Sequence, residues 1–143
     1  MDFYLLLARS NLVLQVVILA LLLASYTFKR KGRFLSHGVL MLIALVLNLV
    51  SFALVMGPSL ISLEPVIMMS ALEKRSIVIV LHATFGSVAD VLAVFILASW
   101  RLRPGTAYCI KRKKVMRMAF MFWLVALSLG ILVYLLQYTD LFL

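Results

Sequence analysis

Acidic residues are scarce in this sequence, and so are histidine and cysteine. The 143 residues include five Asp and Glu, two His and a single cysteine, Cys109. One cysteine excludes a disulfide within the chain and a cysteine-rich metal site. Charged residues make up 13% of the chain, whereas a soluble domain has about a quarter. Because 66% of the residues are hydrophobic, a water-soluble globule and a disordered chain are both excluded.

Long apolar runs are what the sequence does contain. A helix needs about 20 apolar residues to cross a bilayer, and four windows qualify, at about residues 8–28, 34–56, 77–100 and 115–138. Gly57-Pro58 is expected to end the second span. Backbone groups in lipid must be paired internally, which favours helices. The sequence therefore predicts an all-α integral membrane protein, a single domain (1–143) forming an antiparallel bundle of four transmembrane helices.

Basic residues are concentrated in two of the three loops. The first basic loop, residues 29–33, and the second, residues 101–114, contain no acid. The positive-inside rule places both in the cytoplasm of a multi-pass cell-membrane protein, with both termini outside. The first span is too long and too poorly preceded by basic residues for a signal peptide. Contact with the bilayer and its anionic lipids explains the net charge of +9, so no nucleic-acid partner is expected.

The loop between the second and third spans, residues 57–76, is long enough to hold structure. Ser62 to Pro65 is typical of a helix start, with proline in the first turn. Either a short interfacial helix follows, or the chain simply re-enters the membrane.

Several polar side chains lie within the predicted spans. Asp90 is the only acid among them and lies near the middle of the third. It is either a proton-relay carboxylate or a neutral acid hydrogen-bonded to Asn48, since charge is costly at that depth. Asn11 and Gln15 share one helix face and are interpreted, with Asn48, as hydrogen-bonding links between helices. Small and polar residues flanking Asp90 place the third helix in the centre of the bundle.

The two histidines are candidate cofactor ligands. His37 lies near the cytoplasmic end of the second span and His82 near the outer end of the third, a depth difference of roughly 20 Å. One chain therefore cannot supply both imidazoles to one haem iron. Haem bound by one histidine with a methionine remains open, and so does Cu(I) at His82 with Met56, Met68 or Met69. The alternative for His37 is an interfacial histidine in contact with lipid headgroups.

Enzyme signatures are missing, including phosphate-binding loops, paired carboxylates and nucleophile elbows. The chain is therefore expected not to be an enzyme. Cys109 lies among Lys and Arg residues, which would lower the pKa of its thiol, although a lone cytosolic thiol is more often incidental.

Several stretches, in order, resemble the CtaM/YozB-like family of small four-helix membrane proteins, most of unknown function. They are Asn11–Gln15, Lys29–Arg33, Ser36–Gly38 with Met41 and Asn48, Val55–Ser59, Leu81–Gly86, Phe122–Trp123 and Gly130–Tyr134. The family's inner and outer histidines would correspond to His37 and His82. A further histidine that members often carry before the last helix is missing from residues 110–114.

The resemblance implies a role in the respiratory chain, in assembly of or cofactor insertion into a haem-copper oxidase. The alternatives are a haem-binding electron-transfer subunit and a structural accessory subunit. Each reading implies a larger membrane complex or a homo-oligomer, and none is decided by the fold alone.

Overall fold

The chain is almost entirely helical in a computed structural model that describes residues 3–69, 73–101 and 107–138. Its elements are α1 (Phe3–Arg30), α2 (Phe34–Ser51), the π-helical turn η1 (Phe52–Met56), α3 (Gly57–Met69), α4 (Lys74–Trp100), α5 (Ala107–Lys111) and α6 (Lys113–Tyr138). No strand occurs in these described ranges. Four segments are long and apolar enough to cross a membrane: Leu5–Arg30, Phe34–Ser62, Lys74–Trp100 and Lys113–Gln137. The predicted all-α membrane bundle is confirmed.

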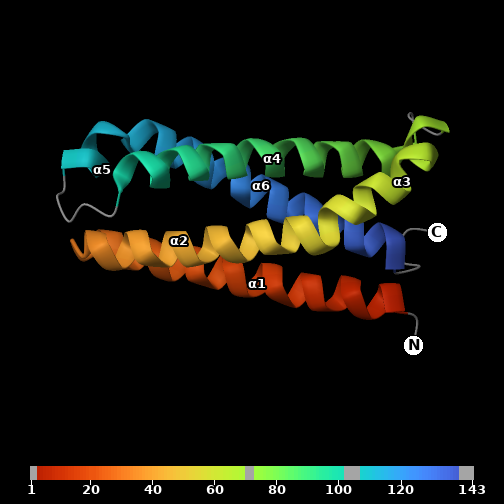
Figure 1. Cartoon of the computed structure of the whole chain (residues 1–143), viewed down its shortest axis with the longest axis horizontal. Helices are drawn as coiled ribbons and strands as arrows, with labels where there is room; N and C mark the ends of the chain where they lie inside the picture. The colour runs from red at the N-terminus through yellow and green to blue at the C-terminus, as the bar shows by residue number, and fades with distance from the viewer. Residues whose placement is uncertain (1–2, 70–72, 102–106, 139–143) are drawn as a thin grey trace.

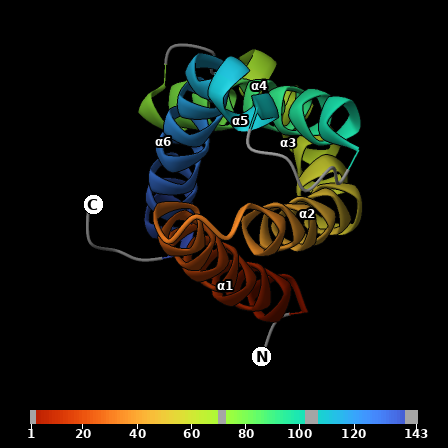
Figure 2. The same cartoon turned by 90° about the vertical axis from the view of Figure 1, so that its left-hand side faces the viewer.

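The four long helices form two antiparallel pairs that lie side by side. α1 packs along α2 and α4 packs along α6, with fewer contacts between α1 and α6 and between α2 and α4. Figure 1 shows the two pairs as separate layers, and the end view in Figure 2 shows the four helices at the corners of a four-sided arrangement. The third predicted span, α4, is therefore not central. It is paired with α6 because both helices present small residues, and a Cβ added at Gly86 would lie only 4.0 Å from that of Ala126.

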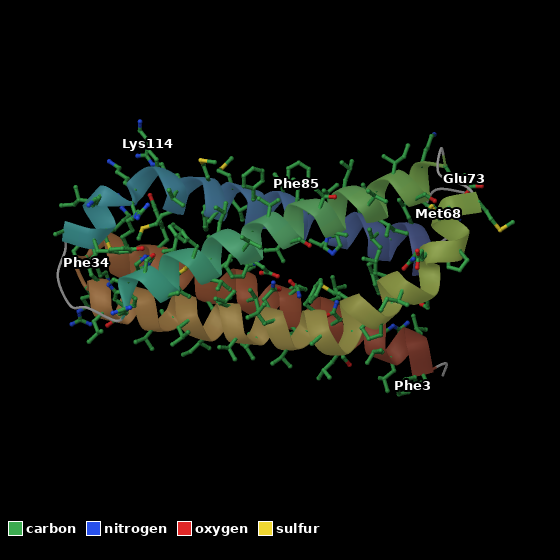
Figure 3. All side chains as sticks on the ribbon, turned by 45° about the horizontal axis from the view of Figure 1, so that its top comes forward. Phe3, Phe34, Met68, Glu73, Phe85 and Lys114 are labelled. Carbon is green, nitrogen blue, oxygen red and sulfur yellow. The ribbon has the colours of Figure 1, made fainter. Side chains whose placement is uncertain are left out.

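The core lies where the two pairs meet. Each long helix contributes two buried residues: Ile18 and Leu22, Ala44 and Leu45, Ala89 and Ala93, Trp123 and Leu127. Many large apolar side chains remain exposed on the outer faces, among them Val13, Leu54 and Val91, and Phe85 points outward in Figure 3. Such apolar exteriors are expected of helices that contact lipid rather than water.

Gly57-Pro58 bends the second span without ending it, which corrects the sequence prediction. Proline lacks an N–H and its ring clashes with the carbonyl four residues earlier, so it commonly kinks or breaks an α-helix. The chain widens into the π turn η1 just before this point, and the Gly57 N–H bonds to the carbonyl of Phe52. α3 then leaves the line of α2 and approaches the start of α4 (Figure 1).

The helix expected in the outer loop is present, but it begins at Gly57 rather than Ser62. It is continuous with η1, and Pro65 lies inside it. The predicted start at Ser62 and the alternative of a simple re-entrant loop are both wrong, because the π turn already absorbs the break and lets the helix continue.

Two left-handed residues shape the basic end of the bundle. Gly32 has φ 73°, and the bonds Arg33 N–H to Phe28 O and Gly32 N–H to Lys29 O form a Schellman motif that closes α1. Arg101 has φ 50° and ends α4. The short α5 is attached to α4 through Tyr108, whose hydroxyl donates to the Ile96 carbonyl at 3.0 Å. The described parts of both basic loops thus lie at one end of the bundle, and Figure 3 shows Lys114 there with Glu73 at the opposite end.

Candidate functional site

A cavity of about 190 Å³ lies between the two helix pairs, within the apolar spans. We call it the first cavity. Its lining includes most of the polar residues that the sequence singled out, together with one methionine and one buried tryptophan: Asn11, Gln15, Asn48, Met56, His82, Asp90, Trp123 and Tyr134. Side chains from α1, η1, α2, α4 and α6 therefore converge on one space.

Four of these side chains, Asn11, Gln15, Asn48 and Asp90, form a hydrogen-bonded cluster with the neighbouring Ser51. We call this cluster the amide network. The Gln15 amide donates to Asn48 Oδ1 and to Ser51 Oγ, both at 3.3 Å. Ser51 Oγ donates to Asn11 Oδ1 at 2.5 Å. These bonds join α1 to α2, as expected for polar side chains that link helices in lipid.

Asp90 extends the amide network to the second helix pair. The Asn48 amide donates to Asp90 Oδ1 at 2.8 Å, so the contact expected from their similar depth is present. Because α2 and α4 otherwise touch little, this bond is a principal polar connection between the pairs. The carboxyl also lines the first cavity, where it can accept a further hydrogen bond from a ligand or water.

Replacing Asp90 separates hydrogen bonding from titration. Asp90→Asn keeps the size of the side chain and an acceptor for the Asn48 amide, and we expect the free energy of unfolding to change little. Asp90→Leu leaves that amide without its partner and should destabilise the bundle by about 1–2 kcal/mol. Reversible unfolding in mixed micelles measures both variants. Equal destabilisation by Asn and Leu would show that the carboxyl does more than accept this bond.

His82 is held in one orientation by the neighbouring helix. Its Nδ1 lies 2.8 Å from the carbonyl oxygen of Ala126, a contact in which Nδ1–H is the donor. Nε2 then carries a lone pair, which is the arrangement of a metal-binding imidazole. The ring reaches this position because residue 130 is glycine, where an added Cβ would lie 2.9 Å from His82 Cε1.

His37 lies in a different place. It lines a second cavity, of about 110 Å³, near the basic end of the bundle. Its Nδ1 contacts Ser25 Oγ at 2.6 Å and the Ser25 carbonyl at 3.0 Å, and Ser25 Oγ donates to the His37 carbonyl. The two imidazoles of one chain therefore face separate cavities.

Ser25, which is fully buried, was missed by the sequence analysis. The signal was available, because Ser25 and His37 are each six residues from Lys31, where the helical hairpin turns. Asn11 and Ser51 are likewise each twenty residues from Lys31. Residues equally distant from the turn of an antiparallel hairpin lie at the same height, so this register pairs them.

The candidate methionine ligands divide in a way the sequence did not predict. Met56 lines the first cavity together with His82. Met68 and Met69, on α3, are 75% and 90% exposed and do not line it. The structure therefore does not bring Met68 and Met69 to the cavity that His82 lines, because α3 continues as a helix that carries both side chains outward.

Cys109 corrects a further expectation. Its thiol is buried in α5 beside the second cavity. Burial raises the pKa of the Cys109 thiol, and the nearby charge of Lys29 opposes this only partly. The side chain is thus a neutral thiol rather than an activated thiolate.

Within the described ranges, no three His, Cys, Asp or Glu side chains come together as a metal cluster. What the site offers is one oriented imidazole, one thioether and a hydrogen-bonded carboxyl around a single cavity. No protein-family model matches the sequence, and no curated protein or solved structure matches it either.

Proposed function

We propose that this chain is a non-enzymatic membrane protein of the respiratory chain that assists assembly of a haem-copper oxidase by handling copper. The observation that carries the proposal is His82, whose Nδ1 is bonded to the Ala126 carbonyl while the ring lines a cavity shared with Met56. Imidazole and thioether are ligands that Cu(I) accepts readily. The resemblance to the CtaM/YozB-like family supports the same role.

The donor set suits a cargo ion better than a resident one. Structural zinc sites commonly use four protein ligands, whereas the first cavity offers Nε2 of His82 and the sulfur of Met56. Both donors are neutral, so Cu(I) binds without displacing a proton from either. Two ligands leave open coordination positions through which a client protein can take the ion.

Haem fits the structure less well. Pockets for small organic ligands measure about 300–1,000 Å³, and the two cavities measure about 190 and 110 Å³. Each is lined by one histidine. We therefore assign no haem to either cavity and no step to haem chemistry.

The charge distribution gives the proposed orientation. By the positive-inside rule, the basic loops lie in the cytoplasm. The start of α1 and the end of α6 then lie outside the cell membrane, and His82 lies in the outer half of the bilayer. Single cysteines at Ser62 and Lys31, in a Cys109→Ser background, test this with an impermeant maleimide. Labelling of position 31 but not of position 62 on intact cells would show that the orientation is the opposite of the one proposed.

The functional test is oxidase activity in cells that carry His82→Ala in place of the native chain. We expect the variant to accumulate normally and the cells to lose most haem-copper oxidase activity at limiting copper, with recovery when copper is added. Met68→Leu, which changes an exposed methionine, is the control and should leave activity intact. Normal oxidase activity in His82→Ala cells at limiting copper would refute the proposed role.

A further inference from the structure

The second cavity lies where the basic loops approach the apolar spans. It is bordered by α1, α2, α4, α5 and α6 at the end of the bundle that faces the viewer in Figure 2. Two cationic side chains, Lys29 of α1 and Arg117 of α6, line it. Most of the remaining lining is aliphatic or aromatic, including Tyr26 and Phe120, whose rings stack at 6.4 Å. The cavity therefore has a positive rim and an apolar wall.

The positive charge has no acidic counterpart nearby in the sequence. No Asp or Glu occurs between residues 3 and 63 or between residues 91 and 139. These ranges include α1, α2, α5, α6 and the part of α4 that lines the cavity. Cys109 also lines the cavity but remains a neutral thiol, as described above. Asp90, the acid of α4, lies in the amide network at the first cavity. Among the described residues, no Asp or Glu lines the second cavity beside Lys29 and Arg117.

Trp100 adds a hydrogen-bond donor that lacks an acceptor. The residue is 3% exposed and lines the second cavity, and its indole Nε1–H has no partner among the described residues. A buried N–H without an acceptor costs about 1–3 kcal/mol, so an acceptor that reached this N–H from the cavity would be stabilising. The two cations and this N–H together favour an oxygen-rich anion.

We propose that the second cavity binds the phosphate group of an anionic phospholipid. The phosphate accepts the hydrogen bond of Trp100 and is balanced by Lys29 and Arg117. A cavity needs about 10–15 Å³ to hold one water, so a cavity of about 110 Å³ has room for a phosphate group without its acyl chains. The chains lie outside, against the exposed apolar faces of the helices. Basic pockets between transmembrane helices are a recognised setting for such headgroups.

The test uses the purified full-length protein in detergent and native mass spectrometry. Phosphatidylglycerol is the anionic probe, phosphatidylcholine the zwitterionic comparison and inorganic phosphate the comparison without acyl chains. We expect retention of phosphatidylglycerol over both others. Arg117→Gln should weaken phosphatidylglycerol binding about fivefold, as for loss of one cation near a lipid surface. Trp100→Phe, which keeps an aromatic ring but removes the N–H, should weaken it about tenfold.

Lys114→Gln is the matched control, because Lys114 is exposed at the same end (Figure 3) but does not line the cavity. It should leave phosphatidylglycerol binding unchanged. Equal losses for Lys114→Gln and Arg117→Gln would overturn the proposal in favour of diffuse surface charge. Tighter retention of inorganic phosphate than of phosphatidylglycerol would overturn the lipid as the ligand. Unchanged phosphatidylglycerol binding in Trp100→Phe would contradict the hydrogen bond between the indole and the phosphate.

Discussion

Gly38→Ala should destabilise the bundle by about 2–3 kcal/mol, as expected for overpacking of a closely packed site. Gly38 is a buried residue of α2, and the six-membered ring of Trp100 occupies the place where a Cβ would project. The ring is itself buried at the end of α4, so an added methyl group would force it out of its place between α2 and α4. The free energy of unfolding in mixed micelles measures the effect.

The glycine and the tryptophan should behave as one unit. The phenyl ring of phenylalanine is shorter than the indole and extends less far toward Gly38. Gly38→Ala should therefore lower the free energy of unfolding only slightly in a Trp100→Phe background. Gly86→Ala is the matched control, since its added Cβ meets only Ala126 at an ordinary 4.0 Å and alanine favours the helix. Additive effects of Gly38→Ala and Trp100→Phe would contradict the packing described here.

Much of the fold follows from the sequence because lipid allows few alternatives. A continuous apolar run of about 20 residues in a bilayer pairs its backbone groups internally as a helix. Loops as short as residues 31–33 force antiparallel neighbours. The sequence could not predict which helices pair. That choice depends on shape, on the small residues of α4 and α6, and on the fit of Trp100 over Gly38. The continuation through Pro58 was missed because a π turn leaves no recognisable signature in the sequence.

The candidate site likewise has features that the sequence predicts and features that it does not. Asp90 and Asn48 could be matched by depth, and the structure has their hydrogen bond. The separation of His37 from His82 also follows from depth along the helices. The sequence could not show that Met56 lines the cavity while Met68 and Met69 do not. That outcome depends on the direction in which α3 leaves the π turn. The unpartnered indole of Trp100 likewise requires knowledge of its surroundings.

His82→Ala is expected to have the largest effect on ligand binding. The imidazole is one of two donors in the first cavity, and loss of an outer-shell partner alone costs a metal site about 10–100-fold in affinity, so loss of the ligand itself should cost at least about 100-fold. Met56→Leu preserves apolar volume and removes the sulfur, and it should weaken Cu(I) binding by a smaller factor. His37→Ala and Met68→Leu change the same residue types outside the first cavity and should have no effect.

The direct test is a Cu(I) titration of the purified protein against a chromophoric chelator, anaerobically and in detergent. We expect one Cu(I) per chain in the native protein and in His37→Ala and Met68→Leu, with His82→Ala losing the ion to the chelator. Copper binding that is equal in native protein and His82→Ala would contradict the assignment of the first cavity as a copper-handling site.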